Sequence, residues 1–569
     1  MNFLLPKVKR MDIDSGYLKQ KSICYYTQDI DFRLKRIADK LPAARDGVEL
    51  IINAGETNDE SYSIKISKND ILISSSGVNG AFYALQTLRQ ILTTWDRVPC
   101  LYIEDKPDFA YRGFYHDIAR GKIPTVDTIK RLIDDMAYYK LNSLQLYVEY
   151  SFEFEETKSI TEKTGCITAD EIKEIGSYAK ENFIEFIPSI ATFGHMYDIL
   201  EQEQYKHLRL LKDYDKKVNI WRERLLHHTI DPRMEESFEF IKSLIDQYYP
   251  LFESDLFNIC GDETFDLKQC CGDDEGKFYA DFICRLIEYL HQKGKKTMMW
   301  SDIILTHPEE IEKISDDVYF LTWDYAADVN ENNIAKLGEL GRKQIVCPGT
   351  SSWRRFCENV DNAEENIVRM IDYGKKYGAE GVLNTNWTDY GSPAGIELAM
   401  YGFVLGATKS WNTDTVVDDE LYNAVNVLLY KNQNGIHYLK KLCSIYDAIP
   451  DTMWQKLCVA YFDIKSGEKI TAEEISDDTI EFIQRGYKEI TDALSHDKWQ
   501  EDRFRKQMLL SAEGICISAE LYAKINGVKV NRVTDTKHWL DEYRRMWLAD
   551  NKESELGKIE EMLLFLENI

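Results

Sequence analysis

The sequence has 569 residues and a formal net charge of −27, and 44% of its residues are hydrophobic. At roughly 150 residues per domain, this length predicts about two to four domains. The negative charge argues against binding to nucleic acid or to an anionic membrane, because both favour a basic protein surface. No run of about 18 apolar residues occurs, so we also expect no membrane span.

The cysteines and histidines show none of the spacings that are typical of metal sites or disulfide frameworks. None of the 12 cysteines is spaced as Cys-x-x-Cys, and the 10 histidines include no His-Glu-x-x-His. The first residues, MNFLLPKVKR, hold too short an apolar stretch for a secretory signal. We therefore expect reduced thiols, a cytoplasmic location, no metal and no cofactor.

Residues 1–107 mix short strand patterns with two helices. Apolar and polar residues alternate over 61–76, on both sides of Lys68-Asn69-Asp70, which predicts a hairpin. Residues 80–95 carry an apolar stripe with helical spacing, and a further helix is expected near 30–41. We interpret this part as a small α/β domain that ends near Lys106-Pro107.

Strand and helix patterns alternate through residues 108–394. Eight short apolar strands are predicted, at 111–118, 143–149, 184–190, 256–261, 296–301, 317–323, 344–349 and 381–387. Eight such units over about 280 residues fit a (β/α)8 TIM barrel. An open doubly wound sheet is the alternative, but the chain has none of the glycine-rich phosphate loops that often accompany that fold.

Residues 395–569 have helical patterns only. We expect helices at 395–409, 418–432, 436–446, 473–494, 498–524 and 536–566, which together would form a C-terminal α-helical domain. The oligomeric state stays open, with a homodimer through this domain as one alternative.

Tryptophans and acids gather where the predicted barrel strands end. Chemistry in a TIM barrel occurs at the carboxyl ends of the strands. Aromatic faces stack on the C–H bonds of a pyranose, and carboxylates accept hydrogen bonds from its hydroxyls, so a sugar is the substrate class that this pattern favours. The residues at these ends include His195, Asp262, Glu263, Trp300, Trp323, Trp353, Trp387, Asp389 and Tyr390.

The step Gly261-Asp262-Glu263 is the most specific of these features. It follows the apolar residues LFNIC, and the glycine allows the backbone to turn tightly. Two adjacent carboxyl groups in different environments can hold different protonation states. An acid–base role is therefore expected for this pair.

Taken together, these motifs resemble glycoside hydrolase family 20, the β-N-acetylhexosaminidases. The resemblance covers residues 1 to about 392. Where the sequence departs from the family pattern, it is more similar to an intracellular branch of the family than to the secreted enzymes. The family pattern His-x-Gly-Gly-Asp-Glu keeps only its last three residues here, and the terminal Trp-x-Glu has become Trp-x-Asp. The matching residues are Arg112, Gly113, Asp117, Arg120, Gly194, His195, Gly261, Asp262, Glu263, Trp387 and Asp389.

The resemblance implies an exo-acting, retaining β-N-acetylhexosaminidase that removes terminal β-linked GlcNAc or GalNAc from small glycans or glycoconjugates. In this family the 2-acetamido oxygen of the substrate attacks C1 and forms an oxazolinium ion. Glu263 would be the acid for the leaving oxygen, and Asp262 would orient the acetamido N–H. Adjacent residues are expected to point apart, which disfavours the usual arrangement of two carboxyl groups on either side of the sugar.

The resemblance also implies which residues bind the sugar. Arg112 would bind the 3- and 4-hydroxyls, Asp389 would bind the 4- or 6-hydroxyl, and His195 would lie behind the acids. Trp300, Trp323 and Trp387 would enclose the acetamido methyl and lie under the ring, and Trp353 is a further substrate-binding candidate. The family's tyrosine on the acetamido oxygen is not matched, because its loop reads Ser351-Ser352-Trp353; Tyr325 or Tyr390 would replace it.

Two alternatives remain at this point. The barrel would bind sugars without catalysis, or it would hydrolyse a sugar that has no acetamido group. The intact Asp262-Glu263 pair argues against the first alternative. In the second, loss of Asp262 would matter little.

Overall fold

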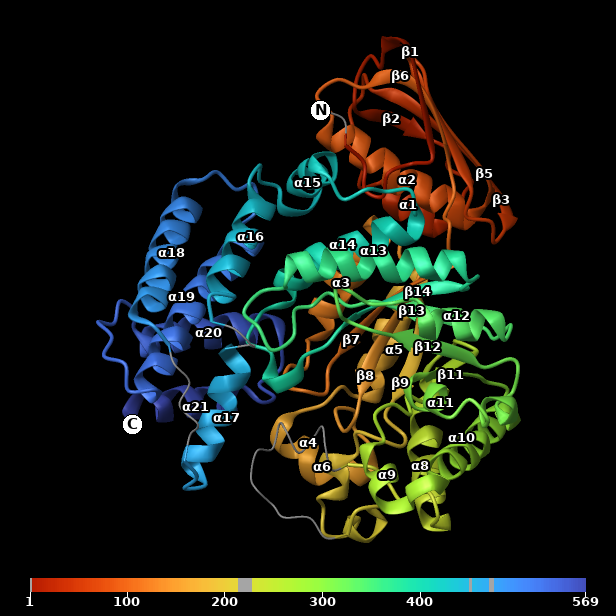
Figure 1. Ribbon diagram of the computed structural model, residues 1–569. Coiled ribbons are helices and arrows are strands. Elements are labelled where there is room, and N and C mark those ends of the chain that lie inside the picture. The colour runs from red at the N-terminus through yellow and green to blue at the C-terminus, as the bar shows by residue number, and fades with distance from the viewer. Residues whose placement is uncertain (1–2, 213–227, 450–452, 470–474) are drawn as a thin grey trace.

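The computed structural model describes residues 3–212, 228–449, 453–469 and 475–569 (Figure 1). A small domain with one sheet, a closed barrel and a set of helices follow one another along the chain. In the described part of the chain, every helix is too short or too polar to reach across a bilayer.

The N-terminal domain is a six-stranded sheet with the order β1-β6-β4-β5-β3-β2. The predicted hairpin is confirmed, since β4 and β5 pair antiparallel with Ser63 opposite Ser74. Helix α2 packs on this sheet and also contacts helix α3 (Val126–Tyr138) of the barrel. The elements are β1 (Arg10–Tyr17), β2 (Ile23–Tyr26), α1 (Phe32–Ala38), β3 (Val48–Thr57), β4 (Tyr62–Ile66), β5 (Asp70–Gly77), α2 (Val78–Thr94) and β6 (Pro99–Asp105).

The central part is a closed barrel of eight parallel strands, so the predicted (β/α)8 fold is confirmed. Almost every strand residue is buried, as expected for strands that are covered on both faces. The barrel closes through the pairing of β9 with β10 and of β14 with β7. The strands are β7 (Tyr111–Asp117), β8 (Ser143–Val148), β9 (Glu185–Ile190), β10 (Leu256–Asn258), β11 (Lys296–Trp300), β12 (Tyr319–Trp323), β13 (Gln344–Cys347) and β14 (Gly381–Asn386).

Amphipathic helices surround the barrel. A capping box is present at the start of α5, where Thr168 and Glu171 cap each other's backbone N–H. The principal helices are α3 (Val126–Tyr138), α5 (Ala169–Glu181), α8 (Glu235–Tyr248), α10 (Glu275–Gln292), α12 (Asn332–Glu339), α13 (Val360–Lys376) and α14 (Met400–Trp411). Helix α14 packs on β14 and β7, so the eighth barrel helix lies beyond residue 394, where the sequence placed the end of the barrel.

The remaining helices pack beside the barrel (Figure 1). The single helix expected over 536–566 is two helices, because the chain leaves helical geometry at Asn551–Glu555. Helix α17 was not among the expected helices. The bounds are α15 (Asp419–Val425), α16 (Gly435–Tyr446), α17 (Met453–Lys465), α18 (Asp477–His496), α19 (Asp502–Ile525), α20 (Thr536–Asp550) and α21 (Leu556–Asn568).

Candidate active site

The acid pair follows β10 on a tightly turned backbone. Cys260, Gly261 and Glu263 have φ angles of 57°, 83° and 49°, in the left-handed region that non-glycine residues rarely adopt. Gly194 makes room for this turn, since a Cβ atom on it would lie 2.4 Å from the Asp262 carbonyl oxygen. Each left-handed non-glycine residue costs about 1–3 kcal/mol, and such residues concentrate at functional sites. The fold therefore holds this pair in a defined and strained position.

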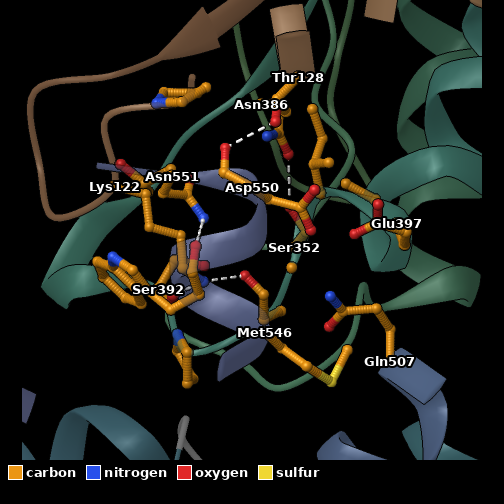
Figure 2. A pocket seen from close by; sticks show the side chains of 18 of the residues that line it. Lys122, Thr128, Ser352, Asn386, Ser392, Glu397, Gln507, Met546, Asp550 and Asn551 are labelled. Atoms are coloured by element: carbon orange, nitrogen blue, oxygen red, sulfur yellow. Dashed lines mark hydrogen bonds between the residues drawn. The ribbon is translucent and has the colours of Figure 1, made fainter. Parts of the chain in front are cut away.

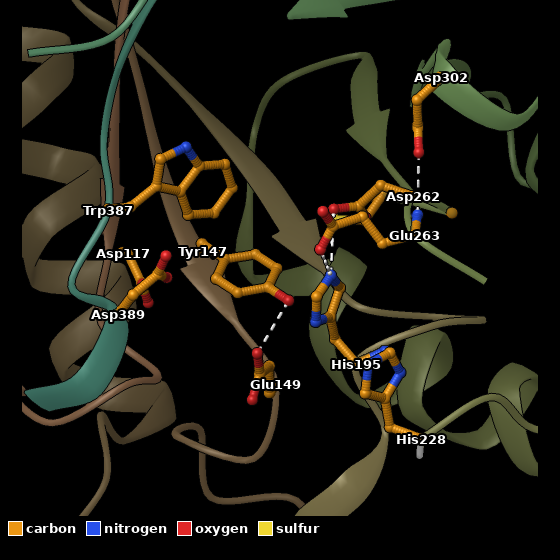
Figure 3. A network of polar contacts seen from close by, with 12 residues as sticks. Asp117, Tyr147, Glu149, His195, His228, Asp262, Glu263, Asp302, Trp387 and Asp389 are labelled. Atoms are coloured by element: carbon orange, nitrogen blue, oxygen red, sulfur yellow. Dashed lines mark hydrogen bonds and ion pairs between the residues drawn. The ribbon is translucent and has the colours of Figure 1, made fainter. Parts of the chain in front are cut away.

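Both carboxylates of the pair meet at one imidazole nitrogen (Figure 3). His195 Nε2 lies 3.3 Å from Asp262 Oδ2 and 3.3 Å from Glu263 Oε2. The expectation that the two side chains point apart is therefore wrong. The cause is the positive φ of Glu263, which turns its side chain toward the side on which Asp262 lies.

Contacts on its other side fix the orientation of His195. Arg120 Nη2 lies 3.1 Å from Nδ1 of His195, and a guanidinium can only donate in this hydrogen bond. The proton of the imidazole is thereby placed on Nε2, facing the two carboxylates. The ring of His228 stacks on His195 at 4.7 Å between centroids, and its Nδ1 accepts the backbone N–H of His195 at 2.8 Å.

The potential ligand atoms of His195, Asp262 and Glu263 lie within 4.8 Å of one another, a spacing that a metal ion could bridge. A metal needs the lone pair of the imidazole nitrogen that faces it. Here that nitrogen carries the proton, because Arg120 donates to the other one. The donor set fits an electrostatic contact between the imidazole and the two carboxylates better than it fits a metal.

Asp262 has one carboxylate oxygen without a hydrogen-bond partner. Among the described residues nothing donates to Oδ1, although this atom is buried and the residue is only 7% exposed. A buried acceptor without a donor is costly, and such an atom is usually a place where a ligand binds. The side chain of Glu263 is more accessible, at 28%.

Arg120 connects the acid pair with the acids of neighbouring strands. Its guanidinium donates to Asp389 at 2.9 Å and to Glu149 at 3.1 Å, in addition to His195. Asp117 lies behind these residues and accepts the backbone N–H of Thr388 at 3.0 Å. Burial raises the pKa of Asp117, and the charge of Arg120 opposes that shift. The loops after β7 and β14 are thus joined directly beside the site.

Arg112 lies at the other end of the barrel, which corrects the role expected from the sequence. It is the second residue of β7, so its side chain belongs to the amino end of that strand. The guanidinium is fully buried, pairs with Glu60 at 2.7 Å and donates to the Lys140 carbonyl at 3.0 Å. Arg120, three residues past the end of β7, occupies the position that the sequence assigned to Arg112.

The tryptophans expected at the strand ends are brought together around Tyr325. Trp387 donates its indole N–H to the Tyr325 hydroxyl at 2.7 Å. Trp323 stacks on Tyr325 at 5.2 Å between centroids, and Trp353 contacts it edge-on at 5.0 Å. Trp300 is fully buried and lies 5.9 Å from Trp387, whereas Trp323 and Trp353 are half-buried.

Tyr390 is held from behind by a C-terminal helix. Its carbonyl accepts the indole N–H of Trp454 at 2.9 Å, and its hydroxyl lies 3.4 Å from Gln455 Nε2. Both partners belong to α17. The sequence left open whether Tyr325 or Tyr390 takes the place of the family's tyrosine. Of the two, Tyr325 is the one whose hydroxyl is hydrogen-bonded to a tryptophan expected in the site.

Asp302 is a third acid beside the pair (Figure 3). Its Oδ2 accepts the backbone N–H of Glu263 at 3.0 Å, and its buried Oδ1 has no hydrogen-bond partner among the described residues. Burial, together with the charges of Asp262 and Glu263, raises the pKa of Asp302 to about 7. This residue holds the backbone of Glu263 in its left-handed conformation.

The Asp302→Asn variant should gain stability relative to the wild type as the pH rises. The folded protein keeps the Asp302 proton up to about pH 7, whereas an unfolded chain loses it near pH 4. Wild-type stability therefore falls between these values and levels off above them. We expect the variant-minus-wild-type free energy of unfolding to be about 1–3 kcal/mol larger at pH 8 than at pH 5.

Urea denaturation at the two pH values measures this difference. Asparagine keeps an oxygen that accepts the Glu263 N–H, so the contact itself is preserved. Titrations of groups that do not interact with Asp302 cancel in the comparison. An equal difference at both pH values would show that Asp302 has an ordinary pKa.

No catalytic or sugar-binding role was predicted for Arg120, Glu149 or Asp302, although Arg120 belongs to the matched family motif. All three lie at or just beyond the carboxyl ends of β7, β8 and β11. The position of each residue relative to the end of its strand was therefore the signal that could have found them. His228 had no comparable signal, because it lies in the long connection after β9.

A closed parallel barrel that carries an acid pair, an arginine and a group of tryptophans at its carboxyl end is typical of a glycoside hydrolase. Residues 109–420 match the profile "Glycosyl hydrolase family 20, catalytic domain", and residues 18–106 match "Glycosyl hydrolase family 20, domain 2". The chain therefore belongs to glycosyl hydrolase family 20.

Curated relatives and solved structures agree with this assignment. A β-hexosaminidase of Porphyromonas gingivalis is 27% identical over 337 residues, which cover 50% of this chain and 43% of the relative. A β-hexosaminidase of Vibrio furnissii is 24% identical over 371 residues, covering 56% and 57%. The chain thus spans about half the length of these relatives.

The fold resembles that of two solved enzymes. Flavobacterium johnsoniae chitobiase superposes with a TM-score of 0.63 at 18% identity, and the matched part covers 95% of each chain. The exo β-N-acetylglucosaminidase of Vibrio harveyi superposes with a TM-score of 0.59 at 18% identity. The matched part covers 75% of this chain and 76% of that enzyme's chain. At this identity the likeness concerns the fold alone.

Proposed function

We propose that the protein is an exo-acting, retaining β-N-acetylhexosaminidase that removes terminal β-linked GlcNAc or GalNAc with help from the substrate's own acetamido group. One observation carries this proposal. Asp262 and Glu263 meet at one nitrogen of His195, while a buried oxygen of Asp262 keeps no protein partner.

The position of the two carboxylates bears on the mechanism. A retaining glycosidase with a protein nucleophile needs one carboxyl group on each side of the scissile bond, about 5 Å apart. Two carboxylates that contact the same imidazole atom approach a sugar from the same side. A nucleophile from the substrate itself is consistent with this geometry.

In the first step, Glu263 gives its proton to the glycosidic oxygen as the bond from C1 to that oxygen breaks. The acetamido oxygen bonds to C1, and positive charge develops on the acetamido nitrogen. Asp262 Oδ1 accepts the N–H of that nitrogen and stabilises the charge. In the second step, Glu263 removes a proton from water, whose oxygen bonds to C1 and reopens the oxazolinium ring.

Residues around the pair would hold the terminal sugar. We assign Arg120, with Asp389, to its 3- and 4-hydroxyls, because both reach the carboxyl end of the barrel and contact each other at 2.9 Å. Tyr325 is assigned to the acetamido oxygen. Its hydroxyl oxygen accepts from Trp387, so its proton is available for a second bond. The four tryptophans would enclose the acetamido methyl and the ring.

Initial rates on three aryl β-glycosides, of GlcNAc, GalNAc and glucose, test the proposal. The two acetamido sugars should be cleaved, and the glucoside should react slower by a factor on the order of a thousand, because it lacks the internal nucleophile. Comparable cleavage of the glucoside would instead indicate a glycosidase that acts without an acetamido group. No cleavage of any of the three would favour a barrel that only binds sugars.

The finer features of the proposal come from the sequence. The intracellular branch, the cytoplasmic location, the homodimer and small glycans as natural substrates stay predictions. The choice between GlcNAc and GalNAc depends on the contact to the 4-hydroxyl, for which Asp389 is one methylene shorter than the family's glutamate.

A further inference from the structure

The C-terminal helices are attached to the chain segment that directly follows Arg120. The connector between α20 and α21 runs antiparallel to residues 121–125, with Pro124 opposite Asn551. Backbone hydrogen bonds join Lys552 N to the Ile123 carbonyl at 2.8 Å and Thr125 N to the Asp550 carbonyl at 3.0 Å. A helical region far away in the sequence thus pairs with the loop that carries Arg120, one of the residues proposed to bind the sugar.

Lys122 extends this attachment to the loop after β14. Its Nζ donates to the Ser392 carbonyl at 2.7 Å and also to the Ala394 carbonyl. Both carbonyls lie shortly after Asp389 in the chain. The ammonium group lies 5.0 Å from the ring centroid of Trp547 in α20, so the C-terminal region also contacts the side chain itself. Lys122 is only 7% exposed.

The two loops touch behind the site. Gly121 has a φ of 132°, and a Cβ atom on it would lie 2.7 Å from Gly391 Cα. Asp117 joins the beginnings of the loops through Thr388 N, and Lys122 joins their later parts. A movement of either loop is therefore transmitted to Arg120 and Asp389.

A cavity of about 40 Å³ lies next to Lys122 (Figure 2). Among the described residues, three buried polar atoms on its wall have no hydrogen-bond partner: Thr388 Oγ1, Glu397 Oε2 and the Tyr543 hydroxyl. Burial lowers the pKa of Lys122 to about 7, and the charges of Glu397 and Asp550 oppose that shift. The cavity interrupts close packing beside Lys122, so the directed hydrogen bonds of this residue contribute to fixing the loops.

Helix α17 provides a second, independent attachment. Trp454 donates its indole N–H to the carbonyl of Tyr390, the residue directly after Asp389. Trp454 is fully buried, so this hydrogen bond is shielded from water. Two separate segments of the C-terminal region therefore hold the loop that carries Asp389.

We propose that Lys122 is a positioning residue through which the C-terminal helical region places Arg120 and Asp389 against the hydroxyls of the terminal sugar. The inference rests on the proposed function for its substrate. Lys122 touches no reacting atom and acts only through the carbonyls of the neighbouring loop.

The first test needs no substrate. Hydrogen–deuterium exchange of the full chain is compared between Lys122→Met and the control variant Lys552→Met. Lys552 also connects the α20–α21 connector to the barrel, but its Nζ contacts Glu171 at 2.7 Å and the Cys166 carbonyl at 2.5 Å. Exchange over residues 119–125 and 388–395 should become faster in Lys122→Met only. Equal exchange in the two variants would overturn the proposal, whatever the enzyme cleaves.

The second test uses kinetics. With an aryl GlcNAc substrate, kcat/KM should fall on the order of tenfold to a hundredfold in Lys122→Met, since a misplacement of about 1 Å has effects of that size. Lys552→Met should stay within about twofold of the wild type, as expected for a partly exposed ion pair. A loss of the same size in both variants would indicate a structural role alone.

The 4-deoxy analogue of the substrate separates positioning from loss of fold. If Lys122 acts through the hydroxyl contacts, the loss in Lys122→Met should shrink to about threefold on this analogue. The same loss on both substrates would overturn the proposal. Trp454→Phe removes the indole N–H together with one of its two rings, and it should show the same dependence on the 4-hydroxyl with a smaller loss. If the wild type cleaves no acetamido sugar, the proposed function fails. The exchange experiment then still tests whether Lys122 fixes the two loops that carry Arg120 and Asp389.

Discussion

Glu263→Gln should lower kcat for a substrate with a poor leaving group by about 10²- to 10⁴-fold, the contribution that general acid catalysis makes. Glutamine has nearly the same shape and keeps one oxygen acceptor, but it has no acidic proton to give to the glycosidic oxygen. Its backbone N–H would still reach Asp302, so the loop should keep its conformation. We therefore expect a loss of rate without a loss of fold.

A comparison of leaving groups provides the internal control. A dinitrophenyl β-glycoside of GlcNAc needs little protonation of its leaving oxygen, so the variant should lose much less rate on it than on a methylumbelliferyl or disaccharide substrate. Thermal unfolding checks the fold, and the midpoint should change by only a few degrees. An equal loss on every leaving group would remove Glu263 from the role of the acid.

Asp262→Asn should lower kcat by about 10²- to 10³-fold for both acetamido sugars, because the group that stabilises the developing charge is lost. The carboxylate oxygen Oδ1 is buried and has no donor of its own among the described residues, so it is poised to accept the acetamido N–H. An asparagine at this position has no negative charge to offset the oxazolinium ion. Its amide could also present a donor where an acceptor is needed.

A thiazoline mimic of the oxazolinium intermediate reports on the same contact. Its affinity should fall in Asp262→Asn in parallel with the loss of rate, because both reflect stabilisation of the charged ring. Asp273→Asn is a matched control, since Asp273 lies on the surface in the region after the same strand. Unchanged thiazoline binding with a normal rate would support a glycosidase that works without the acetamido group.

The barrel could be predicted because the physical signals of its strands are local. Strands buried on both faces are continuous apolar runs, as in LFNIC before the acid pair, and the helices between them have apolar stripes. The end of the barrel was harder to predict. Helix α14 is buried all round, so its pattern does not distinguish a barrel helix from a helix of the C-terminal domain.

The site was predicted in part. The rule that chemistry lies at strand ends correctly brought His195 to Asp262 and Glu263. The family resemblance misassigned Arg112, because its motif contains two arginines. The strand predicted at 111–118 begins beside Arg112 and therefore places it at the amino end of β7. The convergence of the two carboxylates depends on a left-handed φ at Glu263, which a sequence pattern does not reveal.

Contacts between distant segments were not predictable at all. The α20–α21 connector reaches residue 123 only in the folded chain. These contacts depend on tertiary packing, for which the single sequence offers no periodicity.

The ion pair at the amino end of the barrel has a consequence for how the protein unfolds. Glu60 comes from the N-terminal domain, and its partner Arg112 is completely enclosed at the beginning of β7. A second pair, Lys140 with Asp105, joins the same two domains at 3.1 Å and is equally inaccessible. Separating the domains would break both pairs at once, together with the packing that encloses them. The sheet domain and the barrel should therefore lose their structure together, in one cooperative transition.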